Sequence, residues 1–535
     1  MDDPVVSIQG LSIALPIGGD RPFAVEDADL EVKRGEILCV VGESGSGKSV
    51  LASAIMGALP RGLRRTRGEI RFQGEEITAL PEARLRELRG SRIAMIFQEP
   101  MASLNPAIRV GRQIEEVLEI HAPGIRPADR RARVLALMRE MQLPDPEKLA
   151  RRYPHQISGG QCQRVVIAMA LALEPALLIA DEPTTALDVT TQAQILRLIR
   201  ALRDRHGQGV LFVTHDFGVV ADIADRVAVM QRGRLVEIGP ASQVLNHPRH
   251  AYTQQLIAAV PSLTPHPRAA TATPPALVID ALTKSYGDLR AVDAVTFEVP
   301  KGGTVALVGE SGSGKSTLAK AVIRLVAPSG GRVLVEDVDF ARIGWRELMR
   351  RRRLVQMVFQ DPYGSLNPNR TVGDMLVRAG VLGGLSRGES RRRAGELIEL
   401  VGLQREALAR KPDAFSGGQR QRIGIARALA MRPAIVIADE SVSALDVSVQ
   451  KQVLDLMERL QRQAGLTMLF ITHDLRVAAQ IADRIAVMQR GRLVEFGPAV
   501  RVLQTPEHPY TAELVAAAPG RDWEPAAARE KADAG

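Results

Sequence analysis

Short apolar runs without polar alternation recur along the chain and predict buried strands. The main runs occupy residues 36–41, 304–308, 176–180, 434–438, 210–214 and 468–472. The first two lead directly into glycine-rich segments, the next two end at Asp-Glu pairs, and the last two are each followed by a histidine. Runs that are apolar at every position are typical of parallel strands covered on both faces. The carboxyl ends of such strands are where α/β sheets bind ligands.

Helical patterns predict the rest of the layout. A helix is expected to begin at the lysine of each glycine-rich segment, and residues 100–175 and 362–433 are expected to be mostly helical. Both long stretches lie between predicted strands of the same sheet. The pattern therefore predicts an α/β fold with a helical lobe inserted into each sheet domain.

The chain is an internal repeat. GESGSGKS occurs at 42–49 and again at 309–316, and both copies are followed in the same order by the same motifs. The offset between copies falls from 267 at this motif to 258 at the later Ser-Gly-Gly motif, so the first half carries nine extra residues between them. A repeat of this length predicts two similar domains in one chain.

The domain limits follow from the repeat and from composition. We expect a first domain at 1–261, a linker at 262–276, a second domain at 277–519 and a polar tail at 520–535. The linker is rich in Pro, Ala and Thr, which is typical of a short extended connection. Terminal polar segments fray easily, so we expect the tail to be frayed.

Composition restricts the function classes. The chain has 535 residues and two cysteines, which exclude a disulfide framework and offer no CxxC metal spacing. No apolar run approaches the roughly 20 residues of a membrane helix, and the first residues lack the pattern of a secretion signal. The formal net charge is +9, with basic clusters at 350–353 and 391–393. They are interpreted as solvated helical faces; the alternative is attraction to nucleic acid or to an anionic membrane face. We expect no nucleic-acid partner.

The glycine-rich segments have the chemistry of phosphate-binding loops. A loop of this kind between a strand and a helix points successive N–H groups at an anion, and the helix N-terminus adds partial positive charge. Lys48 and Lys315 are expected to reach the β- and γ-phosphates of a nucleotide, with Ser49 and Ser316 on Mg²⁺. The predicted nucleotide-binding residues here are Gly42, Glu43, Ser44, Gly45, Ser46, Gly47, Lys48, Ser49, Gly309, Glu310, Ser311, Gly312, Ser313, Gly314, Lys315, Ser316 and Thr317.

Residues at the other strand ends supply candidates for hydrolysis. Asp181 and Asp439 suit Mg²⁺, and the next residues, Glu182 and Glu440, are expected to face the opposite way because strand side chains alternate. These glutamates are candidates for polarising the attacking water. His215 and His473 are candidates for contacting the γ-phosphate, and Gln98 and Gln360 for sensing Mg²⁺ or the water. The predicted Mg²⁺ ligands are Ser49, Gln98, Asp181, Ser316, Gln360 and Asp439.

A second anion site is predicted in each half. It consists of Ser158, Gly159, Gly160 and Gln161 in the first half, and of Ser416, Gly417, Gly418 and Gln419 in the second. Both segments stand before amphipathic helices, where a hydroxyl and free N–H groups attract anions. One nucleotide needs only one glycine loop. The economical arrangement is therefore a nucleotide held between the loop of one half and the Ser-Gly-Gly segment of the other.

Together these motifs resemble the ATP-binding-cassette ATPases over essentially the whole chain, twice. In that family they are the Walker A, Q-loop, signature, Walker B and switch-histidine motifs, and ALD at 186–188 and 444–446 is the D-loop. The resemblance implies two P-loop NTPase domains, each with a mixed sheet core, an antiparallel β subdomain and an inserted helical subdomain. It also implies ATP and Mg²⁺ as ligands and two composite sites: Lys48 and Glu182 with 416–419, and Lys315 and Glu440 with 158–161.

Two further strings resemble the dipeptide/oligopeptide/nickel import subfamily, whose two ATPase subunits would here be fused. They are SLNP after each Q-loop motif and HAYT or HPYT near the end of each half. Departures from the family pattern are few. Tyr286 fits the position that stacks on adenine, whereas the first half has Leu15 there, with Phe23 as a substitute. Cys162 stands where the second half has Arg420, and Glu-Ser-Val replaces Glu-Pro-Thr after the second Walker B motif.

The resemblance implies the ATPase subunit of a peptide-type importer at the cytoplasmic face of the inner membrane. Its partners would be two transmembrane permease subunits on other chains and, through them, a solute-binding protein. No iron–sulfur cluster is expected. The alternatives are a sugar-type tandem importer ATPase and, from another class, a tandem-cassette ATPase acting on ribosomes, which typically has a long charged helical linker. The sequence leaves the transported solute open.

Overall fold

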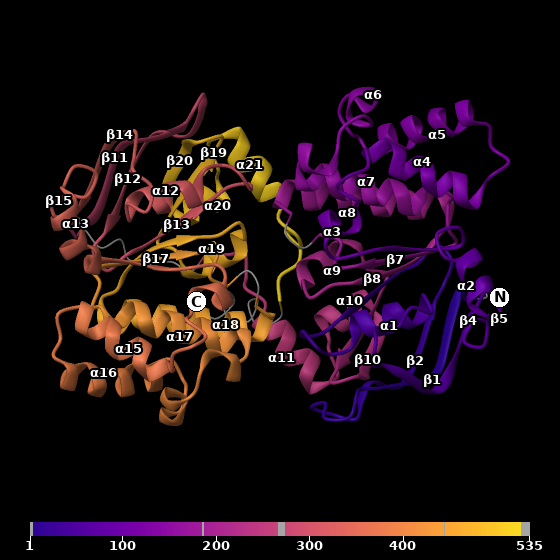
Figure 1. Ribbon diagram of the computed structural model, residues 1–535, viewed down its shortest axis with the longest axis horizontal. Coiled ribbons are helices and arrows are strands. Elements are labelled where there is room, and N and C mark those ends of the chain that lie inside the picture. The colour runs from indigo at the N-terminus through magenta and orange to yellow at the C-terminus, as the bar shows by residue number, and fades with distance from the viewer. Residues whose placement is uncertain (1–3, 185–186, 266–272, 443–444, 526–535) are drawn as a thin grey trace. The chain divides into compact units, whose positions relative to one another are not determined.

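The computed structural model describes residues 4–184, 187–265, 273–442 and 445–525. They form two compact units whose larger parts are Met1–Leu187 with Thr191–Ala258, and Ala259–Glu524. The two units contain the same succession of elements (Figure 1). The unit boundary therefore lies at 258/259, a few residues before the linker expected at 262–276.

A six-stranded mixed sheet is the centre of each unit, with strand orders β10-β9-β3-β8-β7-β6 and β16-β17-β18-β13-β19-β20. All neighbouring strands are parallel except the edge pairs β9–β10 and β19–β20. The strands are β3 (Ile37–Val41), β6 (Ile93–Ile96), β7 (Leu177–Asp181), β8 (Gly209–Val213), β9 (Arg226–Gln231), β10 (Arg234–Pro240), β13 (Thr304–Val308), β16 (Val355–Val358), β17 (Ile435–Asp439), β18 (Thr467–Ile471), β19 (Arg484–Gln489) and β20 (Arg492–Pro498).

Both faces of this sheet are covered, which explains the continuous apolar runs. In β17 the odd-numbered Ile435 and Ile437 belong to a core shared with the antiparallel sheet and the helix after the phosphate loop. The even-numbered Val436 and Ala438 belong to a separate core shared with the inserted helices. All four side chains are at most 2% exposed. A strand buried on both faces has no position for a polar residue, so alternation disappears.

A four-stranded antiparallel sheet lies on one side of each six-stranded sheet, and the inserted helices lie on the other (Figure 1). This arrangement confirms the fold implied by the family resemblance. The strand orders are β2-β1-β4-β5 and β12-β11-β14-β15. The strands are β1 (Val6–Ala14), β2 (Phe23–Val32), β4 (Arg64–Phe72), β5 (Glu75–Glu76), β11 (Pro275–Tyr286), β12 (Leu289–Pro300), β14 (Gly330–Val335) and β15 (Val338–Asp339).

The helices of the two halves also correspond in order, except that a 3₁₀ turn at Arg405–Ala409 takes the place of α6 in the second half. The first half has α1 (Lys48–Ile55), α2 (Glu82–Leu88), α3 (Pro100–Ser103), α4 (Val110–His121), α5 (Pro127–Glu140), α6 (Pro146–Leu149), α7 (Gly159–Leu171), α8 (Val189–His206), α9 (Phe217–Ile223), α10 (Ala241–Asn246) and α11 (Ala251–Ala259). The second half has α12 (Lys315–Val322), α13 (Trp345–Arg351), α14 (Pro362–Ser365), α15 (Val372–Leu382), α16 (Arg387–Leu400), α17 (Gly417–Ala430), α18 (Val447–Ala464), α19 (Leu475–Ile481), α20 (Ala499–Gln504) and α21 (Pro509–Ala516). Short 3₁₀ turns occupy Pro154–Gln156, Arg352–Leu354, Arg405–Ala409 and Pro412–Ala414.

As expected, α1 and α12 begin at the loop lysines, and α3–α7 and α14–α17 fill most of the two stretches expected to be helical. Over the described part of the chain, no helix combines the length and the hydropathy needed to span a bilayer.

One buried arginine in the second unit holds Pro261, the residue before the expected linker, and the start of the tail. Arg476 in α19 is 6% exposed, and its guanidinium donates to the carbonyl oxygens of Pro261 at 2.9 Å, Pro519 at 3.2 Å and Trp523 at 3.1 Å, and to that of Gly520. Trp523 is itself buried. The prediction of a frayed tail is therefore wrong for 520–524, because these backbone carbonyls bind a buried cation; residues 526–535 lie outside the described part.

Candidate functional site

The phosphate loops have a backbone that requires glycine. Gly47 and Gly314, which precede α1 and α12, have φ of 108° and 104°. A Cβ atom at Gly47 would lie 2.4 Å from the carbonyl oxygen of Ala24, and one at Gly314 would lie 2.2 Å from that of Ala291. No side chain fits at these distances, so only glycine allows the loop to turn into the helix here. Both copies place the helix N-terminus at the loop, as an anion site requires.

A buried ammonium group lies inside each loop. Lys48 Nζ donates to the carbonyl oxygens of Gly42 at 2.7 Å and Glu43 at 3.0 Å. Lys315 Nζ makes the corresponding bonds at 2.7 and 2.8 Å. Burial lowers the pKa of Lys315, although the neighbouring carboxylates oppose the shift. A buried ammonium group is stabilised by a bound anion, which is consistent with the predicted phosphate contact.

In each half, the serine that follows the loop lysine lies beside the aspartate that ends β7 or β17. Ser49 Oγ donates to Asp181 Oδ1 at 3.0 Å, and Ser316 Oγ donates to Asp439 Oδ1 at 3.3 Å. Burial raises the pKa of both aspartates, with a further contribution from the adjacent glutamates. A hydroxyl and a carboxylate are oxygen donors of the kind that Mg²⁺ prefers, usually together with substrate phosphates and water. The residues therefore fit the metal expected from the sequence.

In each half a glutamine, a glutamate and a histidine meet beyond the carboxyl ends of three neighbouring parallel strands. Gln98 Nε2 donates to Glu182 Oε2 at 2.8 Å, and His215 Nδ1 lies 3.2 Å from Glu182 Oε1. In the second half the corresponding distances are 2.7 Å for Gln360 to Glu440 and 3.5 Å for His473 to Glu440. Each glutamate is thus held by an amide and an imidazole. Sequence reasoning named all six residues, and the structure brings them together.

The glutamate backbone differs from the expectation. Glu182 and Glu440 do not continue the strand alternation: they lie one residue beyond β7 and β17 with φ of 48° and 44°, in the left-handed region. Their N–H groups donate to Val213 and Ile471 carbonyl oxygens at 2.9 Å. A non-glycine residue in this region is strained, and such strain concentrates at functional sites. The strained turn, rather than alternation, aims the carboxylate at His and Gln.

The charges in this cluster are coupled. Burial lowers the pKa of His215 and His473, but the hydrogen bond and charge of the partner glutamate outweigh burial and raise it overall. Conversely, the hydrogen bond from His473 lowers the pKa of Glu440 against the effect of burial. The carboxylate is therefore kept ionised near neutral pH, which a general base requires.

The Ser-Gly-Gly segments cap α7 and α17. Ser158 Oγ accepts from the N–H of Gln161 at 3.3 Å while Gln161 Oε1 accepts from the N–H of Ser158 at 3.1 Å, and Ser416 and Gln419 repeat the pattern. This is a reciprocal capping box. The serine hydroxyls accept in these bonds, so their protons remain available to an anion. A Cβ at Gly160 would lie 2.7 Å from Thr191, and one at Gly418 would lie 2.3 Å from Val449, so the second glycine of each segment serves close helix packing.

The candidate adenine-binding positions have different surroundings in the two halves. Tyr286 ends β11 and is 49% exposed, with Lys284 Nζ 4.8 Å from its ring centroid. Leu15 is half-buried against the core of the first unit, and Phe23 at the start of β2 is also half-buried.

Of the D-loop segments, Ala186 and Ala444 lie outside the described residues. Cys162 is fully buried near Met101 and Pro154, whereas Arg420 bonds the carbonyl oxygen of Phe415.

Sequence reasoning missed one contact to the phosphate loop. The hydroxyl of Tyr252 accepts a hydrogen bond from the N–H of Glu43 at 3.2 Å, and the hydroxyl of Tyr510 accepts one from the N–H of Glu310 at 3.1 Å. Both tyrosines are nearly buried, and burial raises the pKa of Tyr510 to about 12, so its phenol stays neutral. They are the tyrosines of HAYT and HPYT. Their recurrence near both domain ends was a signal, but nothing local indicated the distant partner.

The segment that holds each tyrosine is itself fixed by hydrogen bonds. In the second half, Glu495 Oε1 and Oε2 accept from the N–H groups of Glu507 and His508, both at 3.1 Å. His508 Nδ1 then accepts from the N–H of Tyr510 at 3.2 Å. Glu237, His250 and Tyr252 make the corresponding contacts in the first half. The C-terminal helix of each half therefore braces the start of its own phosphate loop.

We expect Tyr252→Phe with Tyr510→Phe to raise the KM for ATP about fivefold and to change kcat little. The rings keep their packing, but the loop N–H loses its acceptor, and one hydrogen bond contributes about 1 kcal/mol. Steady-state phosphate release measured against ATP concentration tests this. Tyr153→Phe is the matched control, because that ring stacks on His155, away from the loop. An unchanged KM in the double variant would contradict the bracing role.

Comparison with known proteins gives the same assignment. A family model described as ABC transporter matches residues 25–185 and 292–443. A second, described as the oligopeptide/dipeptide transporter C-terminal region, matches 236–284 and 494–532, which include Tyr252 and Tyr510.

Similar proteins match over nearly their whole length. The glutathione import ATP-binding protein GsiA of Salmonella typhimurium is 45% identical, covering 97% of this chain and 90% of the relative. The peptidoglycan transport ATP-binding protein YejF of Agrobacterium fabrum is also 45% identical, with 96% of both chains covered. The GsiA of Escherichia coli K12 is 43% identical. Each half contains the full set of cassette motifs. The chain therefore belongs to the ABC transporter family, as an ATP-binding protein with two fused cassettes.

Proposed function

We propose that this chain is the ATP-hydrolysing, energy-coupling subunit of a membrane importer for peptides or related small solutes. The observation that carries the proposal is the duplicated Glu–His–Gln cluster beside a phosphate loop, in halves that each end in an oligopeptide/dipeptide-type C-terminal region. The names of the relatives, which describe glutathione import and peptidoglycan transport, support the solute class.

Each catalytic residue has a task that follows from its position. Lys48 and Lys315 would bind the β- and γ-phosphates after leaving the loop carbonyls. Mg²⁺, when bound to Ser49 and Asp181 or to Ser316 and Asp439, would neutralise phosphate charge. Glu182 and Glu440 would accept a proton from the attacking water, because each carboxylate is oriented by an amide and an imidazole.

His215 and His473 would stabilise the same carboxylates and contact the γ-phosphate. Gln98 and Gln360 would sense the γ-phosphate. Each side-chain amide is hydrogen-bonded to the glutamate and would have to release it in order to contact Mg²⁺ or water. We retain the pairing of each loop with the Ser-Gly-Gly segment of the other half as a prediction from sequence. Swinging a permease between two states from 1:99 to 99:1 needs about 5.5 kcal/mol of differential binding, and two nucleotides can supply it.

The proposal includes partners and location. Two transmembrane permease subunits on other chains would change conformation when the cassettes bind and hydrolyse ATP. A solute-binding protein would deliver the solute to them. The chain would then act at the cytoplasmic face of the inner membrane. We propose domain limits of 1–261 and 277–519. The C-terminal-region matches favour this function over a sugar-type tandem importer or a ribosome-acting ATPase.

Reconstitution tests the function. The chain and its two permease subunits are placed in proteoliposomes with the solute-binding protein, and uptake of labelled glutathione, a dipeptide and maltose is followed with and without ATP. We expect ATP-dependent uptake of a peptide-type solute. Uptake of maltose alone would favour the sugar-type alternative. Absence of any association with permeases, together with sedimentation with ribosomes, would overturn the proposal.

A further inference from the structure

The hairpins that lead to the two phosphate loops differ in length. In the first half residues 15–22 connect β1 to β2, whereas in the second half only 287–288 connect β11 to β12. The longer connection begins at Leu15, the position at which the first half lacks the ring that Tyr286 provides in the second. The extra residues therefore lie where the first nucleotide site is expected to need a substitute contact.

One side chain of the longer connection turns back onto the phosphate loop. Arg21 Nε donates to the carbonyl oxygen of Phe23 at 2.9 Å, and its Nη2 donates to that of Gly45, the second glycine of the loop. Residues 16–20 are exposed, but the side chain of Arg21 is only 23% exposed. A long flexible side chain loses rotamer freedom when it is ordered in this way, so these two bonds are what hold it against the loop.

The charge of Arg21 is only weakly neutralised by its neighbours. Within the described part of the chain its ion-pair partner is Asp20, at 3.8 Å, and the side chain of Asp20 is 80% exposed. Such an exposed pair contributes little, because solvent screens it. The two carbonyl oxygens orient the guanidinium without cancelling its charge. Its planar set of N–H donors suits a phosphate, whose geometry it matches.

The first phosphate loop is thus bonded by two cations. Lys48 binds two carbonyl oxygens at the start of the loop, and Arg21 binds that of Gly45. Gly45 lies three residues before Lys48, so a phosphate chain on the N–H groups of this short loop would lie near both charges. A cation that the protein has already ordered gives affinity at a smaller entropic cost than one that the ligand must order.

The short hairpin of the second half offers no equivalent group among the described residues. Its basic residues have other partners: Lys284 Nζ donates to the carbonyl oxygen of Ala327 at 2.9 Å, and Arg290 Nη1 donates to Asp293 Oδ1 at 3.3 Å. The second hairpin therefore provides a ring, and the first provides a cation.

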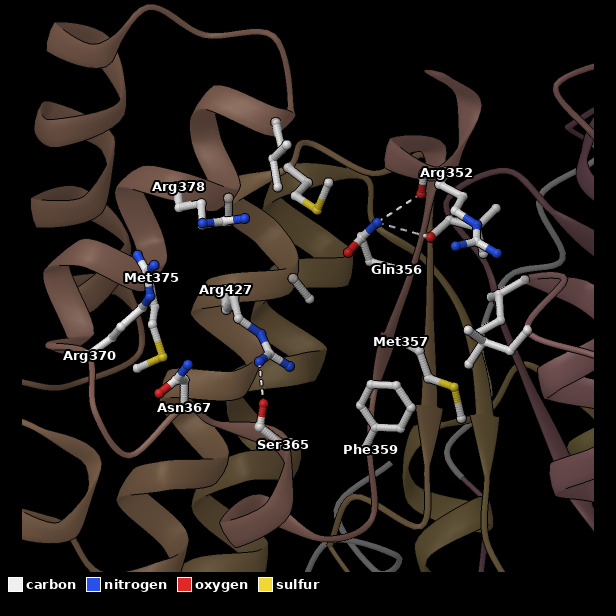
Figure 2. Close-up of a pocket in the computed structure, with 17 residues that line it drawn as sticks. Arg352, Gln356, Met357, Phe359, Ser365, Asn367, Arg370, Met375, Arg378 and Arg427 are labelled. Carbon is white, nitrogen blue, oxygen red and sulfur yellow. Dashed lines mark hydrogen bonds between the residues drawn. The ribbon is translucent and has the colours of Figure 1, made fainter. Parts of the chain in front are cut away.

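The larger group of arginines in the second half also lies away from its phosphate loop. A groove of about 600 Å³ between β16, α15 and α17 is lined by Arg352, Arg370, Arg378 and Arg427 (Figure 2). None of the described residues that line this groove belongs to the loop at 309–316. These arginines do not replace the missing cation.

We propose that Arg21 binds the phosphate chain of the nucleotide at the first site and compensates there for the ring that Leu15 does not provide. The inference deepens the proposed function, because it concerns one of the two ATP sites. The first site recognises its ligand by phosphate charge, and the second adds contact with the base, since stacking acts on the base alone. The two sites of one chain therefore differ in what they select.

Substitution of Arg21 in the full chain tests this assignment. A Lys315→Ala background removes the ammonium group of the second loop, so that binding reports mainly the first site. Equilibrium dialysis measures labelled AMP-PNP with Mg²⁺ and its displacement by inorganic tripolyphosphate. We expect Arg21→Gln to raise the Kd for both ligands about tenfold or more, because a bond to a charged group is lost. Arg21→Lys keeps the charge and is expected to stay within about threefold of the parent.

Two controls show that the effect belongs to this residue and this site. Arg290→Gln makes the same charge change in the hairpin of the second half, where the side chain pairs with Asp293, and should leave both Kd values unchanged. Photolabelling with an azido-ATP, followed by mass spectrometry, makes the comparison without the Lys315 substitution. There Arg21→Gln should lower the label on the first half and leave that on the second. Urea unfolding without nucleotide verifies that each variant is folded.

The outcomes separate the possible roles of Arg21. Unchanged affinity and labelling in Arg21→Gln overturn the inference. An equal loss in the Gln and Lys variants would identify Arg21 as a backbone brace, and a loss for AMP-PNP without one for tripolyphosphate would identify a contact to the base; either overturns it and leaves the proposed function intact. Failure of the unsubstituted chain to bind AMP-PNP overturns both.

Discussion

Replacing Glu182 and Glu440 together with glutamine is expected to lower ATP turnover at least about a hundredfold while ATP binding persists. Loss of a general base typically costs 10²- to 10⁴-fold in rate. Glutamine keeps the shape of the side chain and can still bond Gln98 or Gln360, but it cannot accept the proton of water. Phosphate release and retention of labelled ATP after gel filtration measure the two effects.

The two single variants show whether the halves contribute equally. The control is Glu75→Gln with Glu406→Gln, which changes the same number of charges on exposed residues. Its turnover should match the wild type. Undiminished hydrolysis in the Glu182 and Glu440 double variant would contradict the role assigned to both glutamates.

Replacing Arg476 with alanine is expected to destabilise the second unit by about 3 kcal/mol or more. The change removes a charged donor from four carbonyl groups, three of them in buried hydrogen bonds, and each hydrogen bond to a charged group contributes about 1.5–3 kcal/mol. The guanidinium also lies 5.9 Å from the ring centroid of Trp523. In a Trp345→Phe background Trp523 is the single tryptophan, so its fluorescence during urea unfolding reports this region directly.

Arg476→Lys is the conservative control. It keeps the charge but has a compact head that cannot span the same carbonyls, so an intermediate loss is expected. The first half has Gly218 at the equivalent position, so it has no arginine there to make these bonds. An unchanged unfolding midpoint in the alanine variant would show that the observed bonds contribute nothing to the attachment.

The sequence predicted the central sheets well because burial on both faces removes polar residues from the strands. It also predicted that Gln98, Glu182 and His215 would meet, since the carboxyl ends of neighbouring parallel strands share one edge of the sheet. The repeat strengthened both predictions by presenting each motif twice. These are consequences of local pattern and strand order.

Other features depend on tertiary contacts that leave no local pattern. The left-handed backbone at Glu182 and Glu440 looks from sequence like continued strand. The role of Gly160 emerges only when Thr191 packs against it. The docked tail was missed because a polar segment looks frayed until Arg476, far away in sequence, offers a cation to its carbonyls.

The brace from the C-terminal helix determines when each nucleotide site is completed during synthesis. Glu43 and Tyr252 are 209 residues apart, and Glu310 and Tyr510 are 200 apart. At about 5–20 residues per second, each new loop waits about 10–40 s on the ribosome for its tyrosine. The first loop receives its brace while most of the second half is still unmade. The two halves of this fused chain therefore mature one after the other, although they work together afterwards.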